Sequence, residues 1–555
     1  MNRKSSPAQD TVFLRQQMRD HLVSTPERFD VVIIGGGITG AGIALDAASR
    51  GQKTLLLEKK DFASGTSSRS TKLIHGGLRY LRQMQFHVVA ETGRERAIVH
   101  GLAPHLVIPE KMLLPILRGG SMGRTMIALG LTLYDLLAGV RKEDRKRMLS
   151  REETLQKVPL LPRERVKGGG YYAEYMTDDA RLTLEVIKTA MRHGAWCLNY
   201  TEVTRLTYDK QNKVNGVEAQ DGLSEERFTV QAKHVVNAAG PWVDEVREMD
   251  HSLTGKHLFI TKGVHLVFDR EKLPLNHPIY FDLPDGRMMF LLPRHGIVYA
   301  GTTDTPYTGD KHDPPVTHED VTYLLDGIRH LFPRVDLGVT DVLSSWAGLR
   351  PLIYQEGKSA SEISRKDEIF ISPTGLISMA GGKLTGYRRM AEKVVDRILR
   401  REGRKVRCRT KHIPLTDDPF RDLDEITAFR EEMVHLYPGI SAREADEMVM
   451  KYGRDAQHIL SRAKEEDQSL ILAEAEHAID KEMTFHPLDF LERRSGRMLF
   501  DLPNVKKELP SLLALFARRF GWNPERIAKE KRTVEQGIKM RTPPFPPATE
   551  SASRS

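Results

Sequence analysis

The chain has 555 residues, of which 40% are hydrophobic and 29% are charged. This composition is typical of globular proteins and the length predicts two to four domains, so fibrous, collagen-like and wholly disordered classes are excluded. The two cysteines, Cys197 and Cys408, exclude a disulfide scaffold and a cysteine-rich zinc site, and they suit a reducing cytosol. The N-terminus lacks the apolar core of a signal peptide, and no run of about 18 apolar residues predicts a membrane-spanning helix.

The formal net charge is +9, which three kinds of partner would explain: nucleic acid, an anionic lipid surface or an anionic small substrate. The basic excess is concentrated in residues 111–151, with a net charge of +6, and in residues 501–555, with a net charge of +5. The sign of the charge alone does not choose among the three partners.

The first regular pattern begins at Phe29, after a polar segment (residues 1–28) that predicts a short extension or a peripheral helix. The run FDVVII predicts a buried parallel strand, AGIALDAASRG predicts a helix closed by Gly51, and QKTLLLEKK predicts a second buried strand. Together these segments form one βαβ unit of about thirty residues.

Three glycines lie between the first strand and the helix and form the pattern G-x-G-x-x-G: Gly35, Gly37 and Gly40. The first allows a tight turn, the second lets the backbone approach a pyrophosphate, and the third permits close helix–strand packing. Glu58 ends the second strand, 18 residues beyond Gly40, where a carboxylate can accept hydrogen bonds from ribose hydroxyls. The unit predicts a dinucleotide site without a 2′-phosphate, and both NAD and FAD fit this pattern.

The next segment, GTSSRSTKLIHGGLRYL at residues 65–81, is rich in hydroxyls and glycines. Its hydroxyl-rich loop can hold phosphate oxygens, and its glycine pair lets the backbone lie close to a flat ligand. The predicted contact residues are Thr66, Ser67, Ser68 and Gly76. Lys72 and Arg79 form a basic pair in the same segment.

Coarser patterns follow along the chain. Residues 86–165 are mainly helical in pattern, residues 200–240 alternate like a β-meander, and residues 255–345 mix strands with Pro- and Gly-rich turns. Residues 369–400 predict two strands, a glycine turn and a helix, and the pattern is helical from about residue 416. Ser441 and Glu444 predict a capping box, and the terminal TPPFPPATESASRS predicts disorder.

The run from GGGITG to HGGLRYL closely resembles the flavin-dependent glycerol-3-phosphate dehydrogenases, within the D-amino-acid-oxidase-like flavoproteins. Further matching motifs follow in order: DDARL at 178–182, NAAGPWVD at 237–244, TKGVH at 261–265, GTTDT at 301–305, AGLRPL at 347–352 and GGKLTGYR at 381–388.

The resemblance implies an α/β fold in which a Rossmann-like FAD-binding domain is interleaved with a mixed-sheet substrate domain and followed by an α-helical C-terminal domain. The expected boundaries are residues 1–28 for the extension, 29–415 for the FAD-binding domain, about 86–165 and 255–345 for the substrate segments, 416–541 for the helical domain and 542–555 for a disordered tail.

The resemblance also implies a reaction. Bound FAD would accept a hydride from sn-glycerol 3-phosphate, giving dihydroxyacetone phosphate, and a membrane quinone would take the electrons. Such an enzyme would serve glycerol and glycerophospholipid catabolism and feed a respiratory chain, as a cytoplasmic protein held peripherally at the inner face of the membrane. An oxidase that passes electrons to oxygen, a flavoprotein without enzymatic activity and a homodimeric state stay open. A nucleic-acid-binding flavoprotein is disfavoured because the site motifs do not suit it and basic–aromatic interleaving is absent from the sequence.

The matching motifs imply roles for particular residues. His75 and His265 compete as the base for the hydroxyl proton, because histidine titrates in a suitable range. Arg350 is expected to face the substrate oxygen or the phosphate, and Lys383 to point into the site as a further catalytic residue. Arg79, with Arg365, is expected at the phosphate, which arginine forks bind in bidentate fashion. The other expected cofactor contacts are Gly240, Gly382, Leu384 and Thr385. No metal site is expected.

Two segments are candidates for contact with a membrane. MIALGLTLYDLLAGV at residues 126–140 is apolar, lies between Arg124 and the basic run RKEDRKR, and is too short to span a bilayer. It predicts a helix either at an anionic membrane surface or in the core of the substrate domain. FARRFGWNPERIAKEKR at residues 516–532 is the second candidate.

Overall fold

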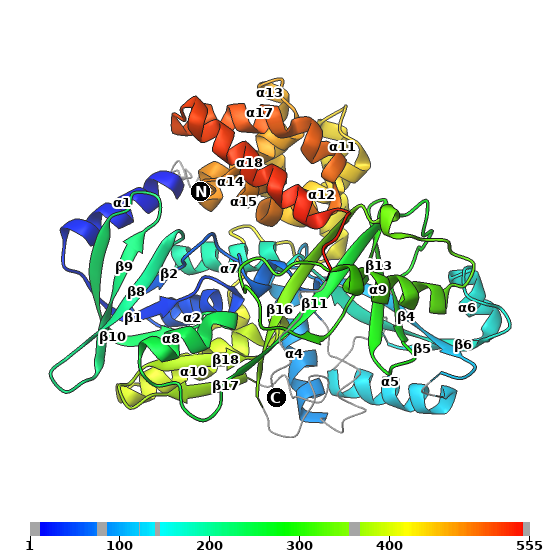
Figure 1. Cartoon of the computed structure of the whole chain (residues 1–555), viewed down its shortest axis with the longest axis horizontal. Helices are drawn as coiled ribbons and strands as arrows, with labels where there is room; N and C mark the ends of the chain where they lie inside the picture. The colour runs from blue at the N-terminus through cyan, green and yellow to red at the C-terminus, as the bar shows by residue number, and fades with distance from the viewer. Residues whose placement is uncertain (1–10, 75–85, 121–122, 139–144, 355–366, 548–555) are drawn as a thin grey trace.

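The computed structural model describes residues 11–74, 86–120, 123–138, 145–354 and 367–547. Two β-sheets lie side by side, and a helical domain formed by the last part of the chain covers both from above (Figure 1). The mixed α/β fold that the resemblance implies is confirmed, and the α-helical C-terminal region is confirmed with it.

The first sheet is built around the predicted βαβ unit. Its strands are β1 (Arg28–Ile34), β2 (Thr54–Leu57), β7 (Trp196–Leu198), β8 (Thr201–Tyr208), β9 (Val214–Asp221), β10 (Arg227–Asn237), β17 (Asp367–Ile371) and β18 (Ile377–Gly381). They follow the order β17-β18-β10-β1-β2-β7, with β9 on β10 and β8 on β9. The strands from β18 to β7 are parallel, which explains why β1 and β2 are apolar on both faces.

Helix α2 (Ile38–Ser49) packs against α7 (Asp179–Arg192) and α10 (Tyr387–Arg401) beside this sheet. Small residues in α2 allow the close approach: a Cβ atom at Gly42 would lie 2.9 Å from the Tyr387 ring. The predicted peripheral helix is α1 (Thr11–Ser24), and it is fixed to the sheet, because its buried Arg15 pairs with Asp221 at 2.7 Å.

The second sheet contains strands from the two segments that are expected to bind substrate. Its strands are β3 (Leu73–Ile74), β4 (Ile108–Leu117), β5 (Arg147–Leu149), β6 (Val166–Met176), β11 (Leu258–Asp269), β12 (Ile279–Asp282), β13 (Met288–Arg294), β14 (Ile297–Gly301), β15 (Thr305–Pro306) and β16 (Ser344–Ile353). Strand β11 is central to the site, because it pairs antiparallel with β14 on one side and with β16 along its whole length.

Helices α4 (Phe86–Leu102), α5 (Arg124–Ala138), α6 (Arg151–Lys157) and α9 (His318–Leu331) accompany the second sheet. The prediction of a mainly helical pattern over residues 86–165 missed β4, which pairs with β6. An apolar run of this length does not distinguish a buried strand from a helix, and its partner lies some fifty residues further along the chain.

The helical domain contains α11 (Leu423–Leu436), α12 (Ala442–Tyr452), α13 (Asp455–Glu465), α14 (Leu470–Glu482), α15 (Pro487–Asp489), α16 (Arg497–Phe500), α17 (Leu502–Phe520) and α18 (Pro524–Arg541), with a π-helical turn, η7 (Phe490–Arg494). The predicted capping box is present at the start of α12, where the Ser441 hydroxyl accepts from the Glu444 amide at 3.2 Å. Within the described ranges no helix has the length and apolarity needed to cross a bilayer.

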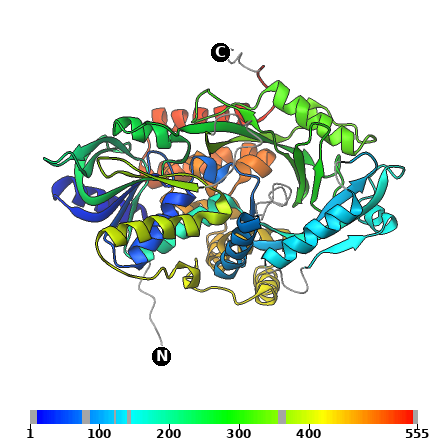
Figure 2. The same cartoon turned by 90° about the horizontal axis from the view of Figure 1, so that it is seen from below.

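The chain returns to the second sheet after α18, so the expectation of a disordered tail does not hold for residues 542–547. Phe545 is buried among the apolar residues under α9, and the His318 amide donates to the Pro546 carbonyl at 2.8 Å. Figure 2 shows this end of the chain beside α9. Apolar burial of a single aromatic side chain fixes a segment whose composition alone indicates disorder.

Candidate active site

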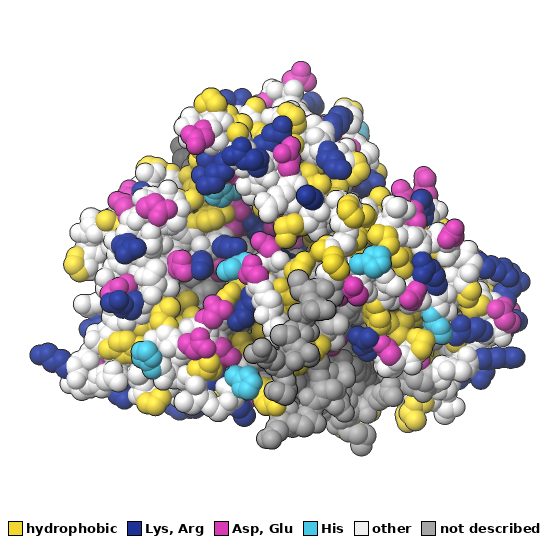
Figure 3. Space-filling view, viewed as in Figure 1, with side chains coloured by type: hydrophobic (Ala, Val, Ile, Leu, Met, Phe, Trp, Pro, Cys, Tyr) yellow, Lys and Arg dark blue, Asp and Glu magenta, His cyan; other side chains and the backbone are white. Residues whose placement is uncertain are grey.

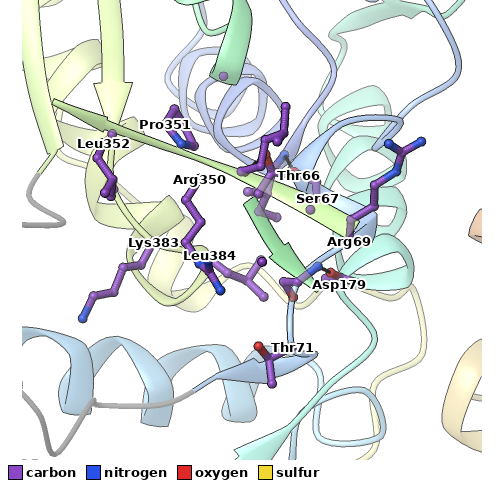
Figure 4. Close-up of a pocket in the computed structure, with 18 of the residues that line it drawn as sticks. Thr66, Ser67, Arg69, Thr71, Asp179, Arg350, Pro351, Leu352, Lys383 and Leu384 are labelled. Carbon is purple, nitrogen blue, oxygen red and sulfur yellow. Dashed lines mark hydrogen bonds between the residues drawn. The ribbon is translucent and has the colours of Figure 1, made fainter. Parts of the chain in front are cut away.

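A cavity of about 1400 Å³ is lined by residues of both sheets. It begins at the carboxyl ends of β1 and β2, where Glu58 lies, and extends past His265 and Arg350 to the side chains of Met126 and Leu133 on α5. Ligands of α/β proteins bind at the carboxyl ends of parallel strands, so this is the place where the predicted dinucleotide site should lie. Figure 4 shows part of its lining.

The glycine turn between β1 and α2 leaves no room for side chains. Gly35 has a φ of +111°, and a Cβ atom there would lie 2.7 Å from the Ala238 carbonyl oxygen. A Cβ atom at Gly40 would lie 1.9 Å from the Gly35 carbonyl oxygen, so only glycine permits this contact between α2 and the turn. Gly37, Ile38 and Thr39 at the start of α2 line the cavity, and a helix N-terminus suits an anionic ligand.

Glu58 closes this end of the cavity. Its carboxylate accepts hydrogen bonds from the Gly36 amide at 2.6 Å and from the Lys60 amide at 2.9 Å. Burial raises the pKa of Glu58, and the two amide donors act against that shift. The side chain is thereby held at the end of β2, beside the glycine turn.

The hydroxyl-rich loop connects the two sheets. The Ser67 hydroxyl accepts from the Ile38 amide at 2.9 Å, at the start of α2, and the Thr66 hydroxyl donates to the Leu349 carbonyl of β16 at 2.7 Å. Both residues line the cavity. Ser68 does not: it is buried, and its hydroxyl donates to the Gly65 carbonyl at 3.4 Å.

Arg350 reaches the cavity from β16. One of its guanidinium nitrogens donates to the Thr303 carbonyl at 3.1 Å and to the Asp304 carboxylate at 3.2 Å, and the other donates to the Thr302 hydroxyl at 2.9 Å. The guanidinium lies across the neighbouring strand, since a Cβ atom at Gly263 would be 2.3 Å from it. The glycine of the TKGVH motif therefore makes room for the arginine of the AGLRPL motif.

His265 lies on β11 opposite Trp346 of β16, and its side chain is buried. The imidazole stacks on the Trp346 indole with ring centroids 4.6 Å apart and an angle of 9° between the planes, and its Nε2 lies 3.0 Å from the Thr71 hydroxyl. Burial, with the positive charges of Arg350 and Lys72, holds the pKa of His265 well below its usual range. The lowered pKa favours the neutral imidazole, whose ring nitrogens can each take part in one hydrogen bond.

Lys383 and its neighbours line the cavity from the other sheet. Gly382 has a φ of +89°, and the chain then forms a short 3-10 turn, η5 (Leu384–Gly386), that leads into α10. Gly382, Lys383, Leu384 and Thr385 all line the cavity, as Gly240 does. In Figure 4 Lys383 and Leu384 lie beside Arg350.

Four predicted site residues lie outside the described ranges: His75, Gly76, Arg79 and Arg365. The remaining predicted residues, apart from Ser68 and the helix-packing Gly40, line one continuous cavity although they come from widely separated motifs.

Comparisons with known proteins match this arrangement. A model of FAD dependent oxidoreductases matches residues 30–388, and a model of the C-terminal domain of alpha-glycerophosphate oxidase matches residues 408–527. The chain is 49% identical to the aerobic glycerol-3-phosphate dehydrogenase of Bacillus subtilis over 532 residues, which cover 93% of this chain and 95% of that protein. It is 48% identical to the Staphylococcus aureus enzyme over 95% of this chain and 97% of that protein.

A solved structure has the same fold. The glycerol-3-phosphate dehydrogenase of Bacillus halodurans, complexed with FAD, is 41% identical, with a TM-score of 0.81 over 96% of this chain and 98% of that chain. The chain belongs to the FAD-dependent glycerol-3-phosphate dehydrogenase family.

FAD is therefore the cofactor of this family member, and the cavity suits it. The cavity extends from the glycine turn to the residues of η5. Ser67 lies close to Gly37, because a Cβ atom at Gly37 would be 3.1 Å from the Ser67 hydroxyl, so there is little space for a side chain in the turn. Of the two dinucleotides that the glycine pattern leaves open, the family decides for FAD.

Two residues that matter for the site of this dehydrogenase family member were not singled out from the sequence: Thr71 and Asp179. Lys72, expected near a ligand, is instead buried in an ion pair with Asp179 at 2.5 Å, and Asp179 also accepts from the Ser70 amide at 2.9 Å. Thr71 contacts His265. The hydroxyl-rich run and the DDARL motif were visible signals, but their pairing joins positions 107 residues apart.

Proposed function

We propose that this protein oxidises sn-glycerol 3-phosphate to dihydroxyacetone phosphate. The observation that carries the proposal is the juxtaposition of a neutral imidazole, His265, and a guanidinium, Arg350, on paired strands that face one cavity. Oxidation of a carbinol requires a group that accepts the hydroxyl proton and a cation that stabilises the developing negative charge on oxygen. The relatives named as aerobic glycerol-3-phosphate dehydrogenases support the choice of substrate.

Bound FAD would supply the acceptor for the hydride that leaves the substrate carbon. Ser67 and the first amides of α2, between Gly35 and Gly40, suit the pyrophosphate, and Glu58 suits the ribose. Residues 382–385 suit the flavin, because the amides that precede α10 favour negative charge on the reduced ring.

The proton acceptor is His265 or His75. The structure supports His265 through its place in the cavity and its neutral state, and the HGGLRY motif supports His75. Arg350 and Lys383 would hold the substrate oxygen, and Arg79 and Arg365 are assigned to the phosphate by the motifs in which they lie.

Anaerobic bleaching of the flavin absorbance tests the reaction. Glycerol 3-phosphate should bleach the flavin, whereas glycerol, which lacks the phosphate, should bleach it far more slowly. H265N and H75N, each with its FAD content measured, decide between the two histidines: the variant of the base should retain flavin and lose turnover by about 10²-fold or more. No bleaching by glycerol 3-phosphate would contradict the proposed reaction.

We propose a membrane quinone as the electron acceptor and α5 as the element that lies on the membrane. Three apolar side chains of α5 are strongly exposed: Met126 at 61%, Leu129 at 66% and Leu136 at 77%. Arg124 begins the helix, and the lower right edge of Figure 3 shows apolar and basic side chains near this region. An amphipathic helix with basic flanks suits an anionic lipid surface.

The second candidate segment is less suitable for membrane contact. Phe516, Phe520 and Trp522 stack on one another inside the helical domain, with Phe516 and Trp522 centroids 5.9 Å apart. Their apolar surface is thus already used in packing, which favours α5.

Vesicle flotation tests the membrane contact. The protein should float with anionic vesicles at low salt and less with neutral vesicles or at high salt, and L129Q should weaken flotation. L436Q is the matched control, since Leu436 is 40% exposed on α11 of the helical domain. Equal flotation of both variants would contradict the role of α5. Measuring quinone reduction against peroxide release separates a dehydrogenase from an oxidase.

A further inference from the structure

The imidazole of His265 is confined on two of its sides. One face stacks on the Trp346 indole, and the ring edge fits against Gly301, where a Cβ atom would lie 2.2 Å from the imidazole Cδ2. Within the described ranges its Nε2 has one hydrogen-bond partner, the Thr71 hydroxyl at 3.0 Å. Its Nδ1 is buried and has no hydrogen-bond partner among the residues that the structure describes. A single hydroxyl thus supplies the polar contact that fixes which way the ring is turned.

Thr71 itself is rigidly placed. The Tyr299 hydroxyl donates to the Thr71 carbonyl at 3.2 Å, and the Trp346 indole donates to the Ser70 carbonyl at 3.2 Å. Asp179 holds the same loop through the Ser70 amide and through Lys72. The loop is therefore fixed by contacts that do not involve the Thr71 hydroxyl, which leaves that hydroxyl available for His265 and for the cavity that Thr71 lines.

We propose that Thr71 is a positioning residue for the reaction, whose hydroxyl holds the His265 imidazole in one orientation at the substrate end of the cavity. The inference rests on the proposed function. The charged groups around the ring are Arg350 on β16 with its partner Asp304, and Lys72 in the loop with its partner Asp179 on α7. None of them hydrogen-bonds the imidazole in the described part of the chain, so the Thr71 hydroxyl supplies the polar contact that, together with the Trp346 stack, aligns the ring.

A double-mutant cycle on flavin reduction tests this. T71V keeps the shape of the side chain and removes the hydroxyl, and it should slow anaerobic flavin reduction by glycerol 3-phosphate by about 10- to 100-fold. T71S should restore the rate to within about threefold of the parent, because it keeps the hydroxyl. In an H265N background T71V should have almost no further effect, since the partner of the hydroxyl is gone.

Y299F is the matched control, because it removes a hydrogen bond to the carbonyl of the same threonine without touching its hydroxyl. FAD content and the unfolding temperature are measured for each variant, and T71A replaces T71V if the valine prevents folding. Equal losses from T71V in the parent and in H265N, or equal losses in T71V and T71S, would overturn the inference. A parent protein that glycerol 3-phosphate does not bleach would contradict the proposed function instead.

Discussion

At the scale of single residues, the site depends on glycines, because their lack of a side chain leaves space for neighbouring groups. Cβ atoms at Gly263, Gly301 and Gly348 would lie within 2.3 Å of the Arg350 guanidinium, the His265 ring and the Arg69 carbonyl oxygen respectively. Each glycine lies in a motif that also contributes a polar residue to the cavity. Each motif therefore supplies two things: a polar side chain for the cavity, and a glycine that leaves space for a residue from another segment.

Gly263→Ala tests this pairing. The added methyl group must displace the Arg350 guanidinium, so kcat/KM for glycerol 3-phosphate should fall by about tenfold or more while FAD stays bound. Steady-state kinetics and the flavin spectrum check both parts. G101A is the control, because a Cβ atom at Gly101 on α4 meets open space. Unchanged kinetics in G263A would show that Arg350 does not act where it lies.

The expected contact of Arg79 with the substrate phosphate predicts an effect on KM. Arg79→Ala should mainly raise the KM for glycerol 3-phosphate, because it removes a contact to the phosphate that is kept from ground state to transition state. R94A, which removes an exposed arginine of α4, should leave KM unchanged. A KM for R79A equal to that of the parent would remove Arg79 from the phosphate site.

At the scale of elements, buried charges join the FAD-binding sheet to the helical domain. Asp61 follows β2 and is buried against the π-helical turn η7, where Arg493 donates to it at 2.6 Å and Arg494 at 2.9 Å. Burial would raise the pKa of Asp61, but the two guanidiniums outweigh burial and lower it. The same holds for Glu482, whose pKa Arg181 and Lys188 lower to about 2.

Removal of Arg494 should be costly, because it takes two of the four side-chain hydrogen bonds that the described residues donate to the buried Asp61 carboxylate. R494A should lower the free energy of unfolding by about 3–5 kcal/mol. R518A, on an exposed arginine paired with Glu476 at 3.5 Å, should change it by about 1 kcal/mol or less. Denaturant titrations of both variants measure the difference, and similar losses would contradict the importance of burial.

These carboxylates also predict a pH dependence. Because the pKa of Asp61 is lower in the folded protein than in the unfolded chain, its stabilisation is complete above the unfolded pKa of about 4 and is lost as the pH falls towards the folded pKa. The unfolding temperature of D61N should therefore lie well below that of the parent at pH 7 and approach it as the pH falls towards 3. A difference that stays constant over this range would exclude the ionised carboxylate as its cause.

Local sequence patterns predicted the local structure of this chain, but they did not predict which distant elements pair with each other. The glycine turn, α2 and the capping box depend on residues within a few positions of each other, and all could be predicted. The register that places His265 opposite Trp346 joins positions 81 residues apart, and the ion pair of Lys72 with Asp179 joins two motifs, so neither follows from spacing. Family resemblance supplied the site residues, but it did not indicate that Ser68 turns away from the cavity.

At the scale of the whole molecule, the helical domain buries charged side chains of the preceding part of the chain and supplies their ion-pair partners. Arg181 of α7 is fully buried and donates to both Glu482 oxygens of α14 at 2.7 Å. A fragment of residues 1–415 would expose this arginine, Asp61 and the apolar surface around them. It should accumulate as insoluble protein without FAD, measured as the soluble flavin absorbance after expression. A soluble, flavin-containing fragment would show that the first two sheets fold independently.

The last six described residues connect the helical domain back to the second sheet. The chain leaves the substrate sheet for the first sheet, enters the helical domain, and then returns to the substrate sheet, where the Ser345 hydroxyl of β16 donates to the Arg541 carbonyl and Phe545 is buried. Removal of Phe545 and the residues that follow it should therefore loosen the hold of the helical domain on the strand that carries Arg350.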